Sequence, residues 1–338
     1  MARHLPRPLR AAGAVAVGAG LLALGATAAV RRSGGSLRRS ASGEHDHLTD
    51  LSPVHHQLDT ADGGTLHVVE LGEGPPVVLL HGVTLQWWVW HRQFRDLAAD
   101  HRVLAWDMRG HGESVAGSDG INLTAVGNDL ALLLEELDVR GAVVVGHSMG
   151  GMALGRFCSD HHDVLADRVD GLVFMATSVA TMGLPVLSSG MLGLLNLVSR
   201  ATTSGMRAQV KYGWPETDLS FTLVRSAFGK VADPDDVSDV RQMISEFPPE
   251  SAAEAGDSIA RHDVREDLSH VDVPAVVLVG DADRLTPPAH ARLVRDCVPG
   301  AELVVLPGIG HQVMQEAPLA VLEVLATLER RTRRRRDG

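Results

Sequence analysis

The feature that most constrains the fold is a series of short apolar runs, each of which ends in turn residues. They lie at residues 77–80, 103–106, 142–145, 172–175, 275–279 and 303–306. A strand that is apolar at every position is buried on both faces, as in a parallel sheet covered by helices. Two further segments, 54–60 and 65–71, flank the turn Asp62-Gly63-Gly64, which predicts an antiparallel hairpin at the start of the sheet.

Helical patterns separate these runs, among them residues 123–137 and the final segment 318–330. The alternation predicts an α/β fold with a mostly parallel, doubly wound sheet. It breaks between about residues 178 and 267, where Gly, Pro and helical patterning occur without a strong strand. We therefore expect a helical cap inserted after the sixth strand, over the carboxyl edge of the sheet, where such folds bind ligands.

These patterns divide the chain into a sheet-forming core with additions. The core is expected at residues 41–177 and 268–330, the cap at 178–267, an N-terminal basic and apolar segment with its linker at 1–40, and a basic tail at 331–338. The net charge is −11, although residues 1–40 hold seven Arg and no acid. The body is therefore strongly acidic, which argues against nucleic acid as a partner, because phosphate neutralisation drives that binding.

Residues 11–30 carry no charge and are flanked by arginines. Their length suits a membrane span, which needs ~20 apolar residues. More arginines follow the segment than precede it, which favours a membrane-associated protein with a cytoplasmic body. Ala26-Thr27-Ala28 resembles a cleavage site, so secretion after signal cleavage is the alternative. The third interpretation is an N-terminal extension that does not insert into a membrane.

The strand expected at 142–145 leads into Gly-His-Ser-Met-Gly-Gly at residues 146–151 and then into an apolar helix. The pattern Gly-x-Ser-x-Gly between a strand and a helix permits a strained turn that exposes the hydroxyl of Ser148 at the sheet edge. The helix N-terminus offers N–H groups to developing negative charge. A serine nucleophile also needs a general base, and that base needs an orienting acid.

Candidates for both groups follow in the order serine, acid, histidine. The loop after the strand at 275–279 contains Asp281 and Asp283, and either could be the acid. The strand at 303–306 leads into His311, which among 17 histidines alone combines the required order with a loop at a strand end.

Five motifs in order resemble the α/β-hydrolase superfamily over about residues 54–330: His81-Gly82, Asp-x-Arg-Gly-x-Gly-x-Ser at 107–114, the serine motif, Gly-x-x-Asp at 280–283, and Gly310-His311. The resemblance implies a catalytic triad of Ser148, Asp283 and His311, because the family spacing selects Asp283 and leaves Asp281 as a turn residue. It also implies an oxyanion hole formed by the backbone N–H groups of Val83 and Met149. His81, His147 and residues 107–114 are then expected to have structural roles.

Three tryptophans follow the expected oxyanion loop. Trp87 and Trp88 are candidate substrate-binding residues, with packing in the core as the alternative. The paired histidines of the chain lack converging carboxylate or cysteine ligands, so we predict no metal site.

A serine at the nucleophile position, where the similar epoxide hydrolases and haloalkane dehalogenases carry Asp, indicates acyl transfer to water. We predict a serine hydrolase that cleaves a carboxylic ester, or a thioester, with an apolar moiety and without a cofactor. The expected partner is a small hydrophobic ester. A cofactor-free perhydrolase of the non-haem haloperoxidase kind is the second hypothesis, although such enzymes often carry Pro where this chain has Thr84-Leu85. A ligand receptor on a hydrolase scaffold is the third.

If residues 11–30 form an anchor, the full-length chain should sediment with membranes, whereas a chain of residues 41–338 should be soluble. Turnover of short, water-soluble esters should be unchanged, because every residue of the predicted triad follows residue 41. Ultracentrifugation combined with an ester assay checks both expectations. A secreted mature chain that begins near Ala29 would contradict the anchor and leave the predicted triad intact.

Overall fold

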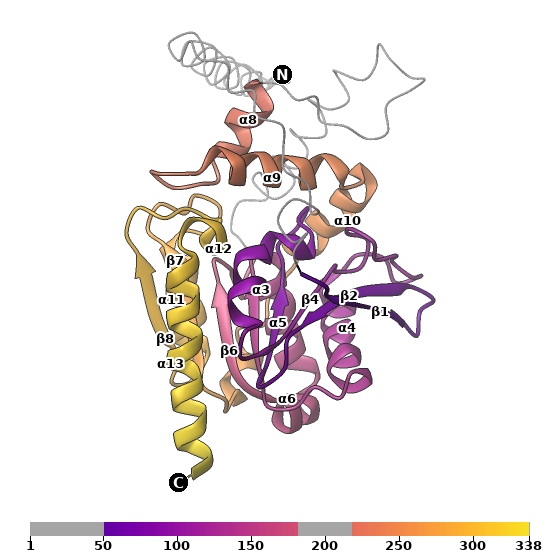
Figure 1. Cartoon of the computed structure of the whole chain (residues 1–338), viewed down its shortest axis with the longest axis vertical. Coiled ribbons are helices and arrows are strands. Elements are labelled where there is room, and N and C mark those ends of the chain that lie inside the picture. Colours follow the sequence, from indigo (N-terminus) through magenta and orange to yellow (C-terminus); the bar gives the residue numbers. More distant parts are fainter. Residues whose placement is uncertain (1–50, 182–217, 338) are drawn as a thin grey trace, which may run out of the picture.

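Eight strands form a single sheet with helices on both faces (Figure 1), in a computed structural model that describes residues 51–181 and 218–337. The strand order is β1-β2-β4-β3-β5-β6-β7-β8. β1 is antiparallel to β2 and β2 to β4, while every other pair is parallel. The predicted fold class is confirmed. The strands are β1 Val54–Asp59, β2 Thr65–Leu71, β3 Pro76–Leu80, β4 Arg102–Trp106, β5 Ala142–His147, β6 Val169–Met175, β7 Ala275–Gly280 and β8 Glu302–Leu306.

Strand β5 lies inside the sheet, between β3 and β6, and all of its residues are buried. Its Val-rich sequence suits this position, because branched side chains pack well on the two covered faces of a pleated sheet. β8 forms one edge of the sheet and is only partly buried, with Val305 exposed. Burial thus decreases from the strand that precedes Ser148 towards the sheet edge.

Two hydrophobic clusters fix the helices against the two faces of the sheet. One face carries α4 Leu123–Glu136, α5 Met149–Asp160 and α11 Pro288–Cys297, and α6 His162–Arg168 lies beside α5. The opposite face carries the short helix η1 Trp87–Trp90 together with α3 His91–Leu97 and α13 Pro318–Asp337. Helices on both faces are what the continuous apolar strands require.

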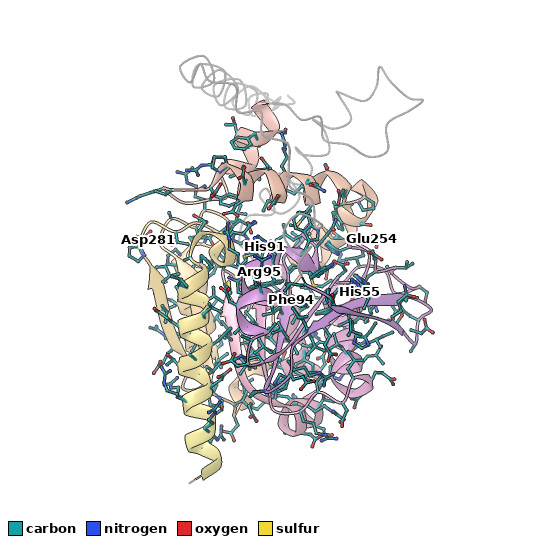
Figure 2. The ribbon with its side chains drawn as sticks, in the orientation of Figure 1. His55, His91, Phe94, Arg95, Glu254 and Asp281 are labelled. Atoms are coloured by element: carbon teal, nitrogen blue, oxygen red, sulfur yellow. The ribbon has the colours of Figure 1, made fainter. Side chains whose placement is uncertain are left out.

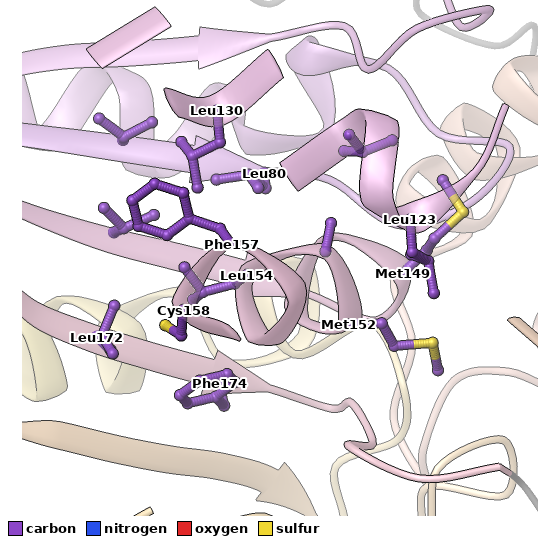
Figure 3. Packing of buried hydrophobic residues seen from close by; sticks show 14 of the residues in the cluster. Leu80, Leu123, Leu130, Met149, Met152, Leu154, Phe157, Cys158, Leu172 and Phe174 are labelled. Atoms are coloured by element: carbon purple, nitrogen blue, oxygen red, sulfur yellow. The ribbon is translucent and has the colours of Figure 1, made fainter. Parts of the chain in front are cut away.

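Helix α5 is held in place by apolar packing around Phe157. Figure 3 shows this ring near Leu80 and Leu130, with Leu154 of the same helix beside it. Phe157 is fully buried. A Cβ atom at Gly127 of α4 would lie 3.2 Å from the Phe157 backbone nitrogen, so α4 and α5 approach closely. This packing fixes the helix that begins directly after Ser148.

The chain between β6 and β7 supplies the helices α8 Asp218–Arg225, α9 Pro234–Glu246 and α10 Pro249–Ala260, followed by η2 Asp267–His270. α8, α9 and α10 lie beyond the carboxyl ends of the strands (Figure 1), where the cap was predicted. Asp233 caps α9 by accepting from the Asp235 N–H, and Pro234 starts the helix. The predicted cap boundaries, 178 and 267, remain a prediction, because residues 182–217 lie outside the described residues.

The basic tail predicted at 331–338 continues α13 through Asp337 rather than ending the helix at residue 330. Arg331 pairs with Glu302, and Arg335 pairs with Asp272, so acids near the starts of β8 and β7 hold the extension. Among the residues with described structure, no helix has the length and apolar character to cross a bilayer. The predicted span at residues 11–30 lies outside that part of the chain.

Candidate active site

Ser148 sits in a strained turn between β5 and α5. Its backbone angles, φ 53° and ψ −117°, lie in a region that residues other than glycine rarely adopt. The flanking glycines make the turn possible: a Cβ atom at Gly146 would lie 2.6 Å from the Gly150 oxygen, and one at Gly150 would lie 2.5 Å from the His81 oxygen. The strand, the turn and the helix can therefore approach only because these positions lack side chains.

Neighbouring groups hold this strained peptide. The Ser148 N–H donates to the Met175 carbonyl at the end of β6, over 3.0 Å. The Thr177 hydroxyl donates to the Ser148 carbonyl over 2.6 Å. With both of its backbone polar groups paired to the adjacent strand end, Ser148 keeps one orientation.

The structure brings together Ser148, Asp283 and His311, the three residues predicted as a triad. His311 Nε2 lies 3.0 Å from Ser148 Oγ, and His311 Nδ1 lies 2.9 Å from Asp283 Oδ2. The three residues follow β5, β7 and β8, whose carboxyl ends meet at the same edge of the sheet. This pattern assigns the proton of the neutral imidazole to Nδ1 and leaves Nε2 as the acceptor for the serine hydroxyl.

The carboxylate of Asp283 is buried and fully used as an acceptor. One oxygen accepts from the N–H groups of Leu285, over 2.8 Å, and Thr286, over 2.9 Å. The other accepts from the Thr286 hydroxyl, over 2.8 Å, as well as from His311. Burial favours the neutral acid, but the charge and hydrogen bond of His311 and the donors of Thr286 outweigh it, and the pKa of Asp283 lies well below its ordinary value. Asp283 is thus a fixed anion beside the imidazole.

Asp281, the other candidate acid, has a different environment. It is exposed and lies at the outer margin of the molecule (Figure 2). Its carboxylate accepts from the Gly308 N–H over 2.6 Å and so joins the loops that follow β7 and β8. This contact is that of a turn residue, and the geometry favours Asp283 as the partner of His311.

The predicted oxyanion loop passes directly beside the nucleophile. A Cβ atom at Gly82 would lie 3.1 Å from the Cβ of Ser148, so the backbone leading to Val83 is in contact with the turn. Met149 is the first residue of α5, where helical N–H groups lack partners within the helix. Both positions thus lie beside the nucleophile, and stabilisation of an oxyanion by the N–H groups of Val83 and Met149 remains a prediction.

Two buried histidines, His81 and His111, hold the predicted oxyanion loop by hydrogen bonds. His81 donates through Nδ1 to the Gly82 carbonyl, over 2.7 Å, and accepts through Nε2 from the Met108 N–H, over 3.0 Å. His111 accepts from the N–H of Thr84, over 3.2 Å, where the backbone has a φ of 66°. The contacts of His81 agree with the structural role expected for it.

His147 packs against the imidazole of His311, with ring centroids 4.9 Å apart. Its Nε2–H donates to the His311 carbonyl over 2.9 Å. Burial lowers the pKa of His147 to about 3 and that of His111 to about 4, so both rings are neutral at neutral pH. His147 therefore supports the backbone of His311 without competing for its proton.

The stretch 107–114 has the structural role expected for it. Asp107 accepts from the N–H groups of Trp87, over 2.8 Å, and Glu113, over 3.1 Å, and pairs with His67 over 3.0 Å. These bonds join the oxyanion side of the site to the turn after β4.

Trp87 and Trp88 both lie in the core. Trp87 packs edge-on against Phe94 at 5.4 Å between ring centroids, and the Trp88 Nε1–H donates to Gln86 over 2.8 Å. Their burial favours core packing, and substrate binding by either remains a prediction. No cluster of three or more metal-ligating side chains occurs in the described parts of the chain.

Sequence reasoning missed Thr177, Thr286 and Glu316. A threonine three residues after an aspartate was a signal for Thr286, because such short-range pairs form turns. Thr177 contacts Ser148 from the segment that follows β6, and Glu316 binds two loops, so no local pattern identifies either residue.

Comparison with known proteins extends these observations. Residues 75–318 match a family described as the alpha/beta hydrolase fold. A non-heme chloroperoxidase of Kitasatospora aureofaciens is 29% identical over 75% of this chain and 91% of its own length. A pimeloyl-[acyl-carrier protein] methyl ester esterase of Aeromonas hydrophila is 26% identical, over 77% and 98%. A solved thermophilic esterase of Thermogutta terrifontis is 26% identical, with a TM-score of 0.68 over 83% of this chain and 99% of its own.

The neutral buried histidines predict acid sensitivity. In the unfolded chain their pKa is about 6.5, so as the pH falls below this value the unfolded state binds protons that the folded state excludes. Their contribution to stability is complete above pH ~6.5 and is lost as the pH falls towards about 4 for His111 and about 3 for His147. Between pH 7 and pH 5 the free energy of unfolding should decrease by about 2 kcal/mol for each such histidine.

Urea unfolding at pH 7, 6 and 5 measures this decrease. The matched variant is His111→Gln, which has no titrating group and keeps an oxygen to accept from Thr84. Its unfolding free energy should depend less on pH than that of the wild type. An unchanged pH dependence would show that His111 is not held neutral by burial.

Proposed function

The chain belongs to the α/β-hydrolase family, and from that premise we propose that it hydrolyses a carboxylic ester, or a thioester, through an acyl intermediate on Ser148. The observation that carries the proposal is the continuous hydrogen-bonded series from Ser148 Oγ through His311 to Asp283, with distances of 3.0 and 2.9 Å. An esterase and a methyl ester esterase among the similar proteins support the same class of reaction.

In the proposed first half-reaction, Ser148 Oγ attacks the carbonyl carbon while its proton passes to His311 Nε2. The anionic Asp283 stabilises the imidazolium that forms. The carbonyl oxygen gains negative charge between the N–H groups of Val83 and Met149. The tetrahedral intermediate then collapses, His311 gives the proton to the leaving alcohol or thiol, and the acyl group stays on Ser148.

In the second half-reaction, water takes the place of the alcohol. His311 removes a proton from the water as its oxygen attacks the acyl carbon, and the same two N–H groups hold the oxyanion. Collapse returns the proton to Ser148 and releases the carboxylic acid. The transfers between Ser148 and His311 use two groups that lie 3.0 Å apart in the structure.

We propose that the acyl or alcohol part of the substrate is moderately apolar. The cap helices lie over the carboxyl edge of the sheet, where ligands bind in open α/β folds. Specificity in such folds resides in the connecting segments, so the substrate itself has to be found by assay. A panel of chromogenic esters of increasing acyl length is the direct way to rank the candidates.

A second candidate activity is perhydrolysis, in which hydrogen peroxide instead of water attacks the acyl-serine. The similarity to a non-heme chloroperoxidase favours it. The same triad and oxyanion hole would serve, and the product would be a peracid. Halide oxidation that requires both acetate and hydrogen peroxide would identify this activity. A ligand receptor, the third hypothesis, would instead bind esters or react with a serine reagent without measurable turnover.

Replacing the nucleophile tests the proposal. Ser148→Ala should fold normally, because the side chain is small, but should lose ester turnover by roughly 10⁴-fold or more, since the covalent step is no longer possible. The loss is measured with a chromogenic ester, and circular dichroism confirms folding. Retention of more than about a hundredth of the wild-type rate would exclude Ser148 as the nucleophile.

A matched pair of variants tests the acid. Asp283→Asn should lower turnover far more than Asp281→Asn, because only Asp283 orients the imidazole and stabilises its charged form, a role worth about 10⁴-fold in turnover for such an acid. Steady-state kinetics of the two purified variants give the comparison. A larger loss in Asp281→Asn would reverse the assignment.

A further inference from the structure

The loop that carries His311 lies against the cap segment that joins α8 to α9. The His311 N–H donates to the Ala227 carbonyl over 2.8 Å, and the Lys230 N–H donates to the Gly308 carbonyl over 2.8 Å. These two bonds place residues 227–230 alongside residues 308–311. The main chain of the general base in the proposed reaction is thus bonded directly to the cap.

The two segments touch through their backbones. A Cβ atom at Gly229 would lie 2.6 Å from the nitrogen of Gly310, and a Cβ atom at Gly310 would collide with the backbone of Gly229. No side chain fits between them. A displacement of the cap segment would therefore also move Gly310, the residue that precedes His311.

One carboxylate joins both segments. Glu316, at the end of α12 Val313–Glu316, accepts from the Gly229 N–H over 2.6 Å and from the Gly310 N–H over 3.0 and 3.1 Å. Hydrogen bonds to a charged acceptor are stronger than those between neutral groups. Burial raises the pKa of Glu316, while the N–H groups of Gly229 and Gly310 favour its charged form.

We propose that Glu316 is a positioning residue, which locks the His311 loop to the cap so that the imidazole is aligned with Ser148 when the cap segment is seated. This inference rests on the proposed triad. His311 is held by Ala227 and, through Gly310, by Glu316, while His147 donates to its carbonyl. Because a misplacement of about 1 Å can cost ~10²-fold in rate, losing this carboxylate acts on catalysis without any contact with the substrate.

The test uses the full-length protein and a small fluorophosphonate, whose reaction with Ser148 depends on the general base and requires little of the cap's binding surface. Glu316→Ala should lower the second-order labelling rate by about tenfold to a hundredfold. The kcat for p-nitrophenyl acetate should fall by the same factor, while KM should change by less than about twofold. Glu316→Gln should be intermediate, because its amide oxygen can still accept while its NH₂ group opposes a backbone N–H.

Glu70→Gln is the matched control. Glu70, on β2, is a largely buried carboxylate with 18% side-chain exposure that pairs with Arg102 over 2.8 Å and His56 over 3.1 Å, away from the proposed triad. This variant should lower the melting temperature without changing the labelling rate. The comparison separates a positioning effect from a general loss of stability.

Each remaining result decides one claim. A wild-type protein that is not labelled at Ser148 overturns the proposed function. Labelling of wild type, Glu316→Ala and Glu316→Gln at equal rates overturns the positioning role and leaves the proposed function standing. If Glu316→Ala does not fold, the rate of the nearly isosteric Glu316→Gln decides alone.

Discussion

The strained peptide at Ser148 is the constraint on which the rest of the site depends. A serine at φ 53° is unfavourable by itself, and it persists because a buried strand and a buried helix fix both of its ends. The packing of Phe157 keeps α5 in place, and the glycines on either side of the serine let the backbones meet. Hydrophobic burial far from the site thus maintains the position of one hydroxyl.

Electrostatic interactions fix the charges of the site in addition to this packing. Asp283 stays charged in a buried position because donors from its own loop and from His311 surround it. The neighbouring His147 stays neutral, because burial there is not matched by an opposite charge in contact with the ring. An anion on one side and a neutral ring on the other leave His311 as the group that can take up a proton during the proposed reaction.

The sequence predicted the parts of this arrangement that depend on local patterns. All eight strands occur where apolar runs and the Asp62-Gly63-Gly64 turn indicated them, because continuous apolar strands can be satisfied only inside a covered sheet. The Gly-x-x-Asp spacing of the family also selected Asp283 over Asp281, and the structure pairs Asp283 with His311. These features are encoded within a few residues of each strand end.

Other features depend on contacts between distant segments. Trp87 and Trp88 follow the oxyanion loop in sequence, but whether they face a ligand or the core is decided by the helices packed against them. α13 extends beyond residue 330 because Asp272 and Glu302, far away in sequence, meet its arginines. The contacts of Glu316 with two loops likewise appear only after the cap and the core come together.

The central claim is that Ser148 carries an acyl group during turnover. The most direct measurement mixes the protein with a p-nitrophenyl ester, quenches the reaction with acid within milliseconds, and locates the added mass by peptide mass spectrometry. We predict an initial release of about one equivalent of p-nitrophenol per protein, with the acyl mass on the peptide that contains Ser148. An acyl mass on another residue would contradict this claim. So would a burst of p-nitrophenol release from which no acylated protein can be trapped.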